Sequence, residues 1–79
     1  IINDFTIYPN PANGRIKISS KNNLHINTIK IFSIVGKNVH YINNYRSEIE
    51  LDLTHLTSGV YFVDISTDEG TISKRLIIN

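Results

Sequence analysis

The chain has 79 residues and a formal net charge of +1; 41% of its residues are hydrophobic and 19% are charged. This length suits one small domain, and the composition is that of a globular protein rather than a disordered or fibrous one. The absence of cysteine excludes disulfides, thiolate metal sites and a cysteine nucleophile, and without a basic stripe or a long apolar run we expect neither nucleic-acid binding nor membrane insertion.

The N-terminal quarter predicts two strands joined by a turn. Polar and apolar residues alternate over Asp4–Tyr8, which predicts the first strand. Pro9-Asn10-Pro11 ends this strand, because two prolines one residue apart cannot both serve a sheet ladder. Asn13-Gly14 is a strong signal for a tight turn, and Arg15–Ser19 alternates again as the second strand.

The middle of the chain predicts two more strands. Thr28–Phe32 forms the third and runs on to Ile34. Gly36 is expected to adopt a positive φ in the turn that follows, and Val39–Ile42 forms the fourth strand. We expect residues 43–47 to be a loop, because asparagine favours turns.

The C-terminal part predicts the last three strands. Glu48–Leu53 alternates acidic residues outward with apolar residues inward. After a corner at Thr54–Ser58, which has room for one short helical turn, Val60–Ile65 is apolar on both faces as in a central strand. A hairpin closed by Gly70 leads to the seventh strand, Thr71–Ile78. Seven short strands with regular turn signals predict an all-β fold, a seven-stranded immunoglobulin-like β-sandwich with Greek-key connections.

The corner before the sixth strand carries a recognisable structural pattern. In Greek-key sandwiches a tyrosine near the start of a late strand often bonds back to the upstream backbone. Here Leu56 can plug the core, Gly59 allows a sharp turn, and Tyr61 follows two residues later. We therefore expect the Tyr61 hydroxyl to bond to a backbone group of the corner.

No motif in the chain indicates catalysis, a cofactor or a metal. Glu48, Glu50 and Asp52 lie at period 2 on one strand, and although a glycosidase pair could be that close, the perfect alternation favours an outward polar face. Nucleophile-elbow and phosphate-loop patterns are missing. The histidines show no recognised ligand spacing and are expected to stand apart: His25, His40 and His55. The residues alone predict a non-enzymatic β module.

Three stretches in order carry a resemblance to a known family. They are IYPNPA with Gly14 near the start, IKIFSIVGKNV in the middle, and LTSGVYFV with KRLII at the end. Together they resemble the type A C-terminal sorting domain of the bacterial type IX secretion system, over nearly the whole chain. The resemblance places the family's motif positions at Pro9, Asn10, Pro11, Gly36, Gly59, Tyr61, Val63, Lys74, Arg75, Leu76, Ile77 and Ile78.

The resemblance implies that the domain acts as a sorting signal. Such domains look like seven-stranded sandwiches at the C-terminus of exported proteins, so residues 1–79 are expected to be one sorting domain cut from a longer secreted protein. The implied partners are an N-terminal passenger, the outer-membrane type IX translocon with its shuttle proteins, and a sortase-like peptidase that removes the domain. The implied location is the cell surface or the medium, reached through the periplasm of a Gram-negative bacterium.

The expected recognition surface is the last strand, Thr71–Ile78. A terminal edge strand offers unpaired N–H and C=O groups to which a partner strand, or a second copy of the chain, can add. Lys74 and Arg75 either guard this edge against aggregation or make charged contacts with a receptor. The alternative is a fibronectin-III-like or carbohydrate-binding accessory module of a secreted hydrolase, which would use exposed aromatic residues: Tyr8, Tyr41, Tyr45 and Phe62.

Overall fold

In a computed structural model, seven strands make up the regular structure of the described residues. The structure describes residues 5–21 and 24–79, without the side chains of residues 44 and 45. The strands are β1 (Phe5–Tyr8), β2 (Arg15–Ser20), β3 (Ile26–Ser33), β4 (Asn38–Arg46), β5 (Glu48–Asp52), β6 (Gly59–Thr67) and β7 (Gly70–Ile78).

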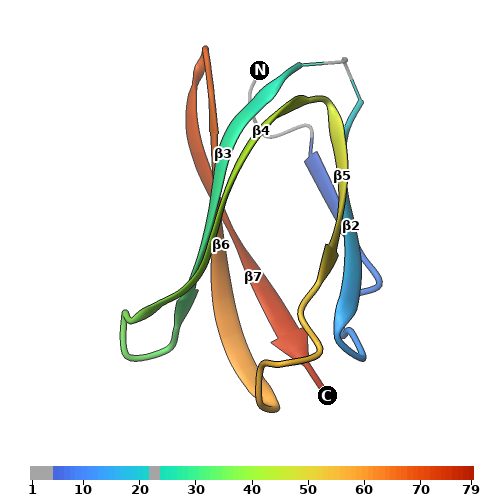
Figure 1. Cartoon of the computed structure of the whole chain (residues 1–79), viewed down its shortest axis with the longest axis vertical. Helices are drawn as coiled ribbons and strands as arrows, with labels where there is room; N and C mark the ends of the chain where they lie inside the picture. The colour runs from blue at the N-terminus through green and yellow to red at the C-terminus, as the bar shows by residue number, and fades with distance from the viewer. Residues whose placement is uncertain (1–4, 22–23) are drawn as a thin grey trace.

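The strands form two antiparallel sheets packed face to face (Figure 1). One sheet has the order β1-β2-β5 and the other the order β4-β3-β6-β7. The chain passes from one sheet to the other after β2, after β4 and after β5. Strands that are distant in sequence therefore become neighbours within a sheet, as β2 pairs with β5 and β3 with β6. This order confirms the predicted immunoglobulin-like sandwich with Greek-key connections.

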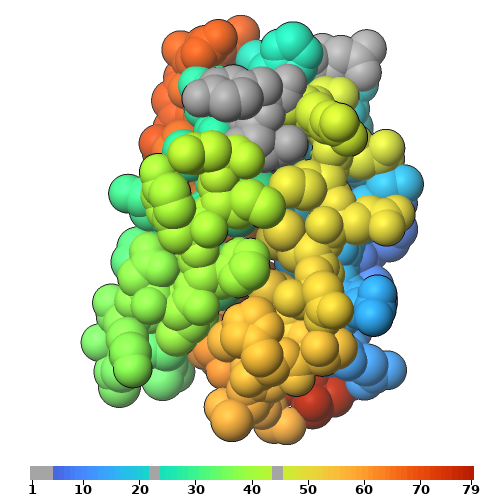
Figure 2. Space-filling model, viewed as in Figure 1, coloured from blue at the N-terminus to red at the C-terminus, as the bar shows by residue number. Residues whose placement is uncertain are grey.

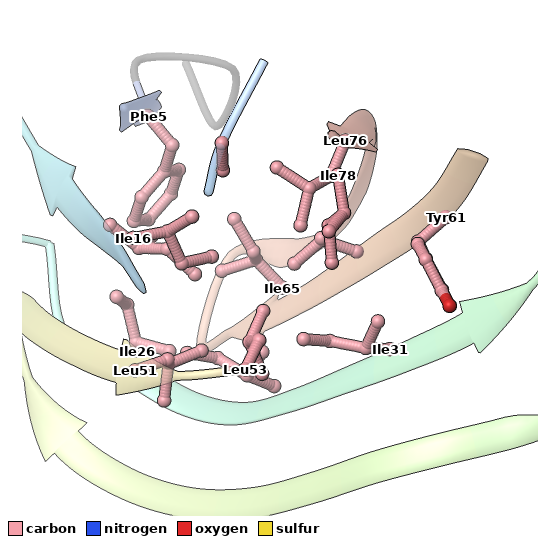
Figure 3. Packing of buried hydrophobic residues seen from close by; sticks show 14 residues of the cluster. Phe5, Ile16, Ile26, Ile31, Leu51, Leu53, Tyr61, Ile65, Leu76 and Ile78 are labelled. Carbon is pink, nitrogen blue, oxygen red and sulfur yellow. The ribbon is translucent and has the colours of Figure 1, made fainter. Parts of the chain in front are cut away.

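Alternate residues of both sheets point inward and fill the space between them (Figure 3). β6 shows the pattern most clearly, because Tyr61, Val63 and Ile65 are buried while Phe62 between them is exposed. The buried cluster consists of Phe5, Ala12, Ile16, Ile18, Ile26, Ile29, Ile31, Leu51, Leu53, Tyr61, Val63, Ile65, Leu76 and Ile78. Isoleucine, a β-branched residue that favours strands, is the commonest residue in this cluster.

The middle strands are longer than the sequence predicted. β3 begins at Ile26 and ends at Ser33, and β4 continues through the expected loop to Arg46. The reason is the ladder between them, in which Thr28 pairs with Asn43 and Ile26 with Arg46. Pairing with a neighbouring strand therefore outweighs the turn preference of the asparagines. Asp4, the predicted start of the first strand, lies outside the described residues.

The surface of the sandwich is uneven at the β3–β4 connection. This hairpin projects beyond its surroundings at the lower left of Figure 2, and its tip exposes 70% of Ile34 and 85% of Val35. The expected strand extension to Ile34 is wrong, because Gly36 N–H bonds to the Ser33 carbonyl and closes the turn there.

The described residues contain no helix with the length and apolar character that a membrane crossing requires.

Candidate functional site

The edge of β7 is partly covered by the segment that follows β1. This crossover segment, Pro9–Asn13, leaves the three-stranded sheet and runs parallel to the end of β7. The Ala12 N–H donates to the Ile77 carbonyl at 2.7 Å, and the Asn79 N–H donates to the Ala12 carbonyl at 2.8 Å. Ala12 is fully buried, so a larger side chain there would push the two segments apart.

Asn10 covers the next part of the same edge with its side chain. Its Nδ2 donates to the Arg75 carbonyl at 2.9 Å, and its Oδ1 accepts from the Ile77 N–H at 3.0 Å. A carboxamide carries a donor and an acceptor side by side. The Asn10 side chain therefore pairs with the outward carbonyl of Arg75 and the outward N–H of Ile77, as the backbone of a neighbouring strand would. The two prolines that flank Asn10 donate no backbone hydrogen bond of their own.

β7 is an edge strand of the four-stranded sheet, as the sequence predicted, but the crossover segment occupies the backbone groups of its C-terminal half. Arg75, Ile77 and Asn79 turn backbone groups outward, and by alternation Thr71 and Ser73 do the same. No strand of the described residues pairs with β7 beside Thr71 and Ser73. The edge is closed from Arg75 to Asn79 and open before it.

An open groove lies beside the covered edge, between β1 and β7. It has a volume of about 420 Å³, and its lining residues are Phe5, Thr6, Ile7, Asn10, Lys74 and Arg75. Lys74 is half-buried and Arg75 is exposed. A partner strand added at the open half would end against Asn10 and have this groove beside it.

The predicted tyrosine corner is present. The Tyr61 hydroxyl donates to the Thr57 carbonyl at 2.7 Å, and only 6% of Tyr61 is exposed. Gly59 has φ 155°, and a Cβ there would meet nothing closer than 3.9 Å, so backbone conformation rather than space favours glycine. The corner sets the register in which Tyr61 pairs with Leu76 and Gly59 with Ile78.

The structure brings together most of the residues that the sequence resemblance gave as motif positions. Pro9, Asn10 and Pro11 lie on the crossover segment, and β6 and β7 carry the rest side by side: Gly59, Tyr61, Val63, Lys74, Arg75, Leu76, Ile77 and Ile78. Gly36 does not belong to this group, because it lies in the β3–β4 hairpin, with φ 86° and no atom within 4 Å of a Cβ built on it. Sequence reasoning missed Ala12, whose signal is a small residue directly after the second proline.

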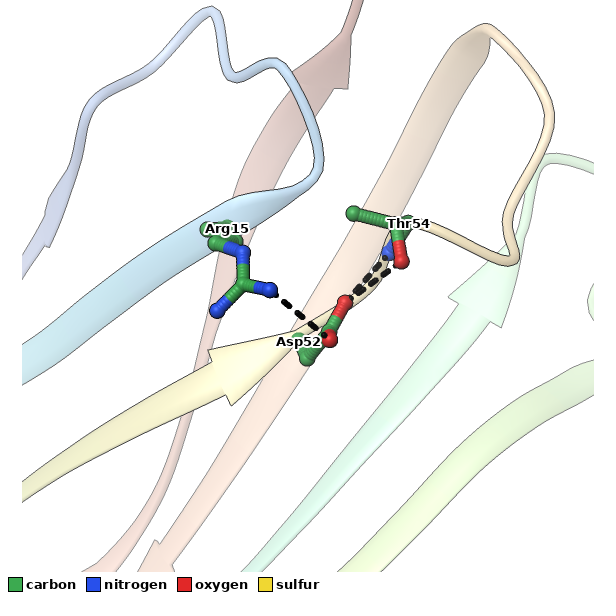
Figure 4. A network of polar contacts seen from close by, with 3 residues as sticks. All are labelled: Arg15, Asp52 and Thr54. Atoms are coloured by element: carbon green, nitrogen blue, oxygen red, sulfur yellow. Dashed lines mark hydrogen bonds and ion pairs between the residues drawn. The ribbon is translucent and has the colours of Figure 1, made fainter.

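The outer face of the three-stranded sheet is charged and internally paired. Arg15 lies 3.5 Å from Asp52, whose other oxygen accepts from the Thr54 N–H and hydroxyl at 3.0 and 2.6 Å (Figure 4). The hydrogen bonds from Thr54, with a smaller contribution from Arg15, lower the pKa of Asp52. Lys17 bonds to Glu48 at 2.8 Å, which raises the pKa of Lys17. A lowered carboxyl pKa is the opposite of what a general acid needs.

Two histidines that the sequence placed apart are neighbours in the fold. The rings of His40 on β4 and His55 in the β5–β6 connection lie 5.7 Å apart at 42°. Burial and, second, the charge of His55 lower the pKa of His40. Among the described residues, no group of three or more metal-binding side chains comes together, so this pair has no third ligand there.

Comparison with known proteins gives a family and a fold. The model of the family described as "Secretion system C-terminal sorting domain" matches residues 6–79. A solved structure of PorZ, an essential bacterial surface component of the type-IX secretion system of human oral-microbiomic Porphyromonas gingivalis, superposes with a TM-score of 0.77 at 20% identity. That match covers 99% of this chain but only 12% of the PorZ chain. No curated protein matches.

Proposed function

The chain belongs to the Por secretion system C-terminal sorting domain family, and from this membership we propose that it directs an attached N-terminal passenger through the type IX outer-membrane translocon. The family is a non-catalytic secretion signal that interacts with the secretion machinery and leads to the cell surface. The proposed route runs through the periplasm of a Gram-negative bacterium. Shuttle proteins and the translocon are the proposed partners, and residues 1–79 are the proposed sorting unit.

The structural observation that supports this proposal is the contact between the crossover segment, near the start of the chain, and β7, near its end. The family's first motif supplies Asn10, whose side chain bonds to Arg75 and Ile77 of its last motif. The proposed recognition surface is the crossover segment together with the exposed residues of β7. After export, a sortase-like peptidase removes the domain, and the passenger is released or anchored to the surface.

A reporter fusion tests the proposal in a host that has a type IX system. A periplasmic signal peptide and a soluble reporter precede residues 1–79, and the reporter is measured in periplasm, surface and medium. We expect the reporter at the surface or in the medium, shortened by the mass of the domain. An uncleaved but exported fusion would contradict only the peptidase step, whereas periplasmic retention of the wild-type fusion would refute the sorting function.

Point variants separate recognition from folding better than a truncation does. Deleting Lys74–Asn79 removes Leu76 and Ile78 from the core, so loss of export would reflect unfolding as much as loss of the signal. Arg75→Thr instead changes an exposed side chain, and Arg15→Thr on the opposite sheet is its matched control. We expect only Arg75→Thr to slow export while both variants keep a cooperative thermal transition.

A further inference from the structure

The two outer faces of the sandwich differ in chemistry. The face of the three-stranded sheet carries exposed or half-buried charged residues: Arg15, Lys17, Glu48, Glu50 and Asp52. These types, apart from arginine, are depleted at the centres of protein interfaces. Its cross-strand ion pairs, Arg15–Asp52 and Lys17–Glu48, already satisfy much of its charge internally. This face has the character of a solvated surface.

The outer face of the four-stranded sheet is apolar at its centre. Phe32 on β3 pairs directly with Phe62 on β6, and in the next outward-facing row Val60 pairs with Ile77. Alternation places these four side chains on one face, because their neighbours Ile31, Tyr61, Val63, Leu76 and Ile78 are buried on the other. Opposed residues in a sheet have Cβ atoms about 5 Å apart, and Val60 and Phe62 stand two residues apart on the same face of β6, about 7 Å by strand geometry. We therefore treat the four side chains as one patch. We call it the aromatic face, together with Tyr41, Lys30 and Arg75 at its border.

The border of the aromatic face is mainly cationic. Arg75 pairs with Phe62 across the β6–β7 ladder, and Lys30 lies between Tyr41 and Asp64 with its Nζ 5.7 Å from the Tyr41 ring centroid. Lys37 is exposed in the adjoining β3–β4 hairpin. Among the described residues, Lys30 and Arg75 therefore border the patch together with one carboxylate, Asp64, and Lys37 adds a cation in the adjoining hairpin. A complementary surface would be apolar at its centre with carboxylates at its rim.

We infer that the aromatic face is a second docking surface, for a protein component of the secretion machinery with an apolar, acid-rimmed surface. This inference rests on the proposed sorting function. It extends the contact from Arg75 and Ile77, which the aromatic face shares with the motif positions, to residues of β3, β4 and β6 outside them. Aromatic residues and arginine are the types that contribute most to protein interfaces, and Phe62 and Tyr41 are 38% and 54% exposed. A broad sheet face fits a protein surface better than a bilayer, into which backbone and charge of a whole sheet cannot insert.

The test compares matched variants in the reporter fusion. Phe62→Thr combined with Tyr41→Thr removes the aromatic side chains while threonine keeps a strong preference for strands. Lys30→Glu reverses one border charge with no change in buried volume, and it keeps the test valid if the double variant unfolds. The controls are Glu50→Thr on the charged face and Lys21→Glu in an exposed turn. Thermal melting of each chain shows that the fold persists.

We expect the double variant and Lys30→Glu to slow export about tenfold, the loss that removal of one strong interface residue produces, while both controls export like the wild type. Wild-type rates for both aromatic-face variants would refute this inference and leave the sorting function intact. Retention of the wild-type fusion itself would overturn both. Binding of the free chain to vesicles of 80% phosphatidylcholine and 20% phosphatidylglycerol, or to a glycan array, that is lost in the double variant would overturn the protein partner in favour of a membrane or a sugar.

Discussion

Replacing Asn10 by alanine should loosen the terminal edge of β7. The change removes the donor to the Arg75 carbonyl and the acceptor of the Ile77 N–H, at 2.9 and 3.0 Å. Each such hydrogen bond contributes about 0.5–1.5 kcal/mol to stability. Asn10 is exposed, so water can replace part of what is lost, and we expect the free energy of unfolding to fall by about 1–2 kcal/mol. For a domain of this size the melting temperature falls by about 4–8 °C per kcal/mol.

Urea unfolding and hydrogen exchange together measure this effect. In Asn10→Ala the Ile77 amide loses its acceptor, so its protection from exchange should drop more than that of amides in β3. Asn13→Ala is the matched control, because the Asn13 side chain makes only a 3.4 Å contact with the Asn79 carboxamide. We expect Asn13→Ala to change stability by less than about 0.5 kcal/mol. Equal effects of the two variants, or unchanged Ile77 exchange in Asn10→Ala, would refute the role assigned to Asn10.

Three further predictions concern the tyrosine corner, the glycine turns and the half-buried imidazole of His40. Tyr61→Phe removes the 2.7 Å hydrogen bond of the corner and should cost about 1 kcal/mol in chemical denaturation; an unchanged midpoint would contradict a structural corner. Gly14→Ala should cost more than Gly36→Ala, although both have positive φ, because only the first places a Cβ 2.8 Å from Thr54 Cγ2; equal losses would show that the turn relaxes freely. The pKa of His40 is lower in the folded chain than its ordinary value of 6.5, so the unfolded chain takes up the proton first and stability should fall as the pH falls through 6.5. Urea unfolding at pH 7.5 and 5.5 should show a smaller pH dependence in His40→Gln than in the wild type, and an identical one would refute this origin.

Local patterns in the sequence predicted the number and order of the strands but not the full extent of every strand. Alternation over Glu48–Leu53 correctly separated the buried Leu51 and Leu53 from the exposed acidic residues. The asparagines at 43 and 44 were misleading, because their turn preference is a local property whereas the β3–β4 ladder is a property of the pair. The same reason hides the contact between His40 and His55, which only the closing of the sandwich brings together.

Local sequence patterns could not predict that the crossover segment covers the edge of β7. The Asn10 side chain bonds to Arg75 and Ile77, which follow it by 65 and 67 positions in the sequence. No sequence periodicity connects a proline-flanked asparagine with a strand at the other end of a chain. The sequence did indicate that the first strand stops at Pro9, and resemblance placed Asn10 among the motif positions. What it lacked was the direction of the crossover segment, which turns toward the four-stranded sheet and closes half of an edge that we expected to be open.

Burial divides the family's motif positions into two physical roles. Tyr61, Val63, Leu76 and Ile78 are at most 6% exposed, so a receptor cannot touch them and they can act only by building β6 and β7. The other positions have exposed or half-buried surface: Gly36 in the β3–β4 hairpin, Gly59 at the start of β6, those of the crossover segment, and Lys74, Arg75 and Ile77 on β7. Among them, the Asn10 side chain bonds to the Arg75 carbonyl. A signal read at this place depends on residues from both ends of the chain. Under the proposed sorting function, the core positions contribute by holding these two exposed groups in register, and we expect substitutions there to reduce export only as far as they reduce folding.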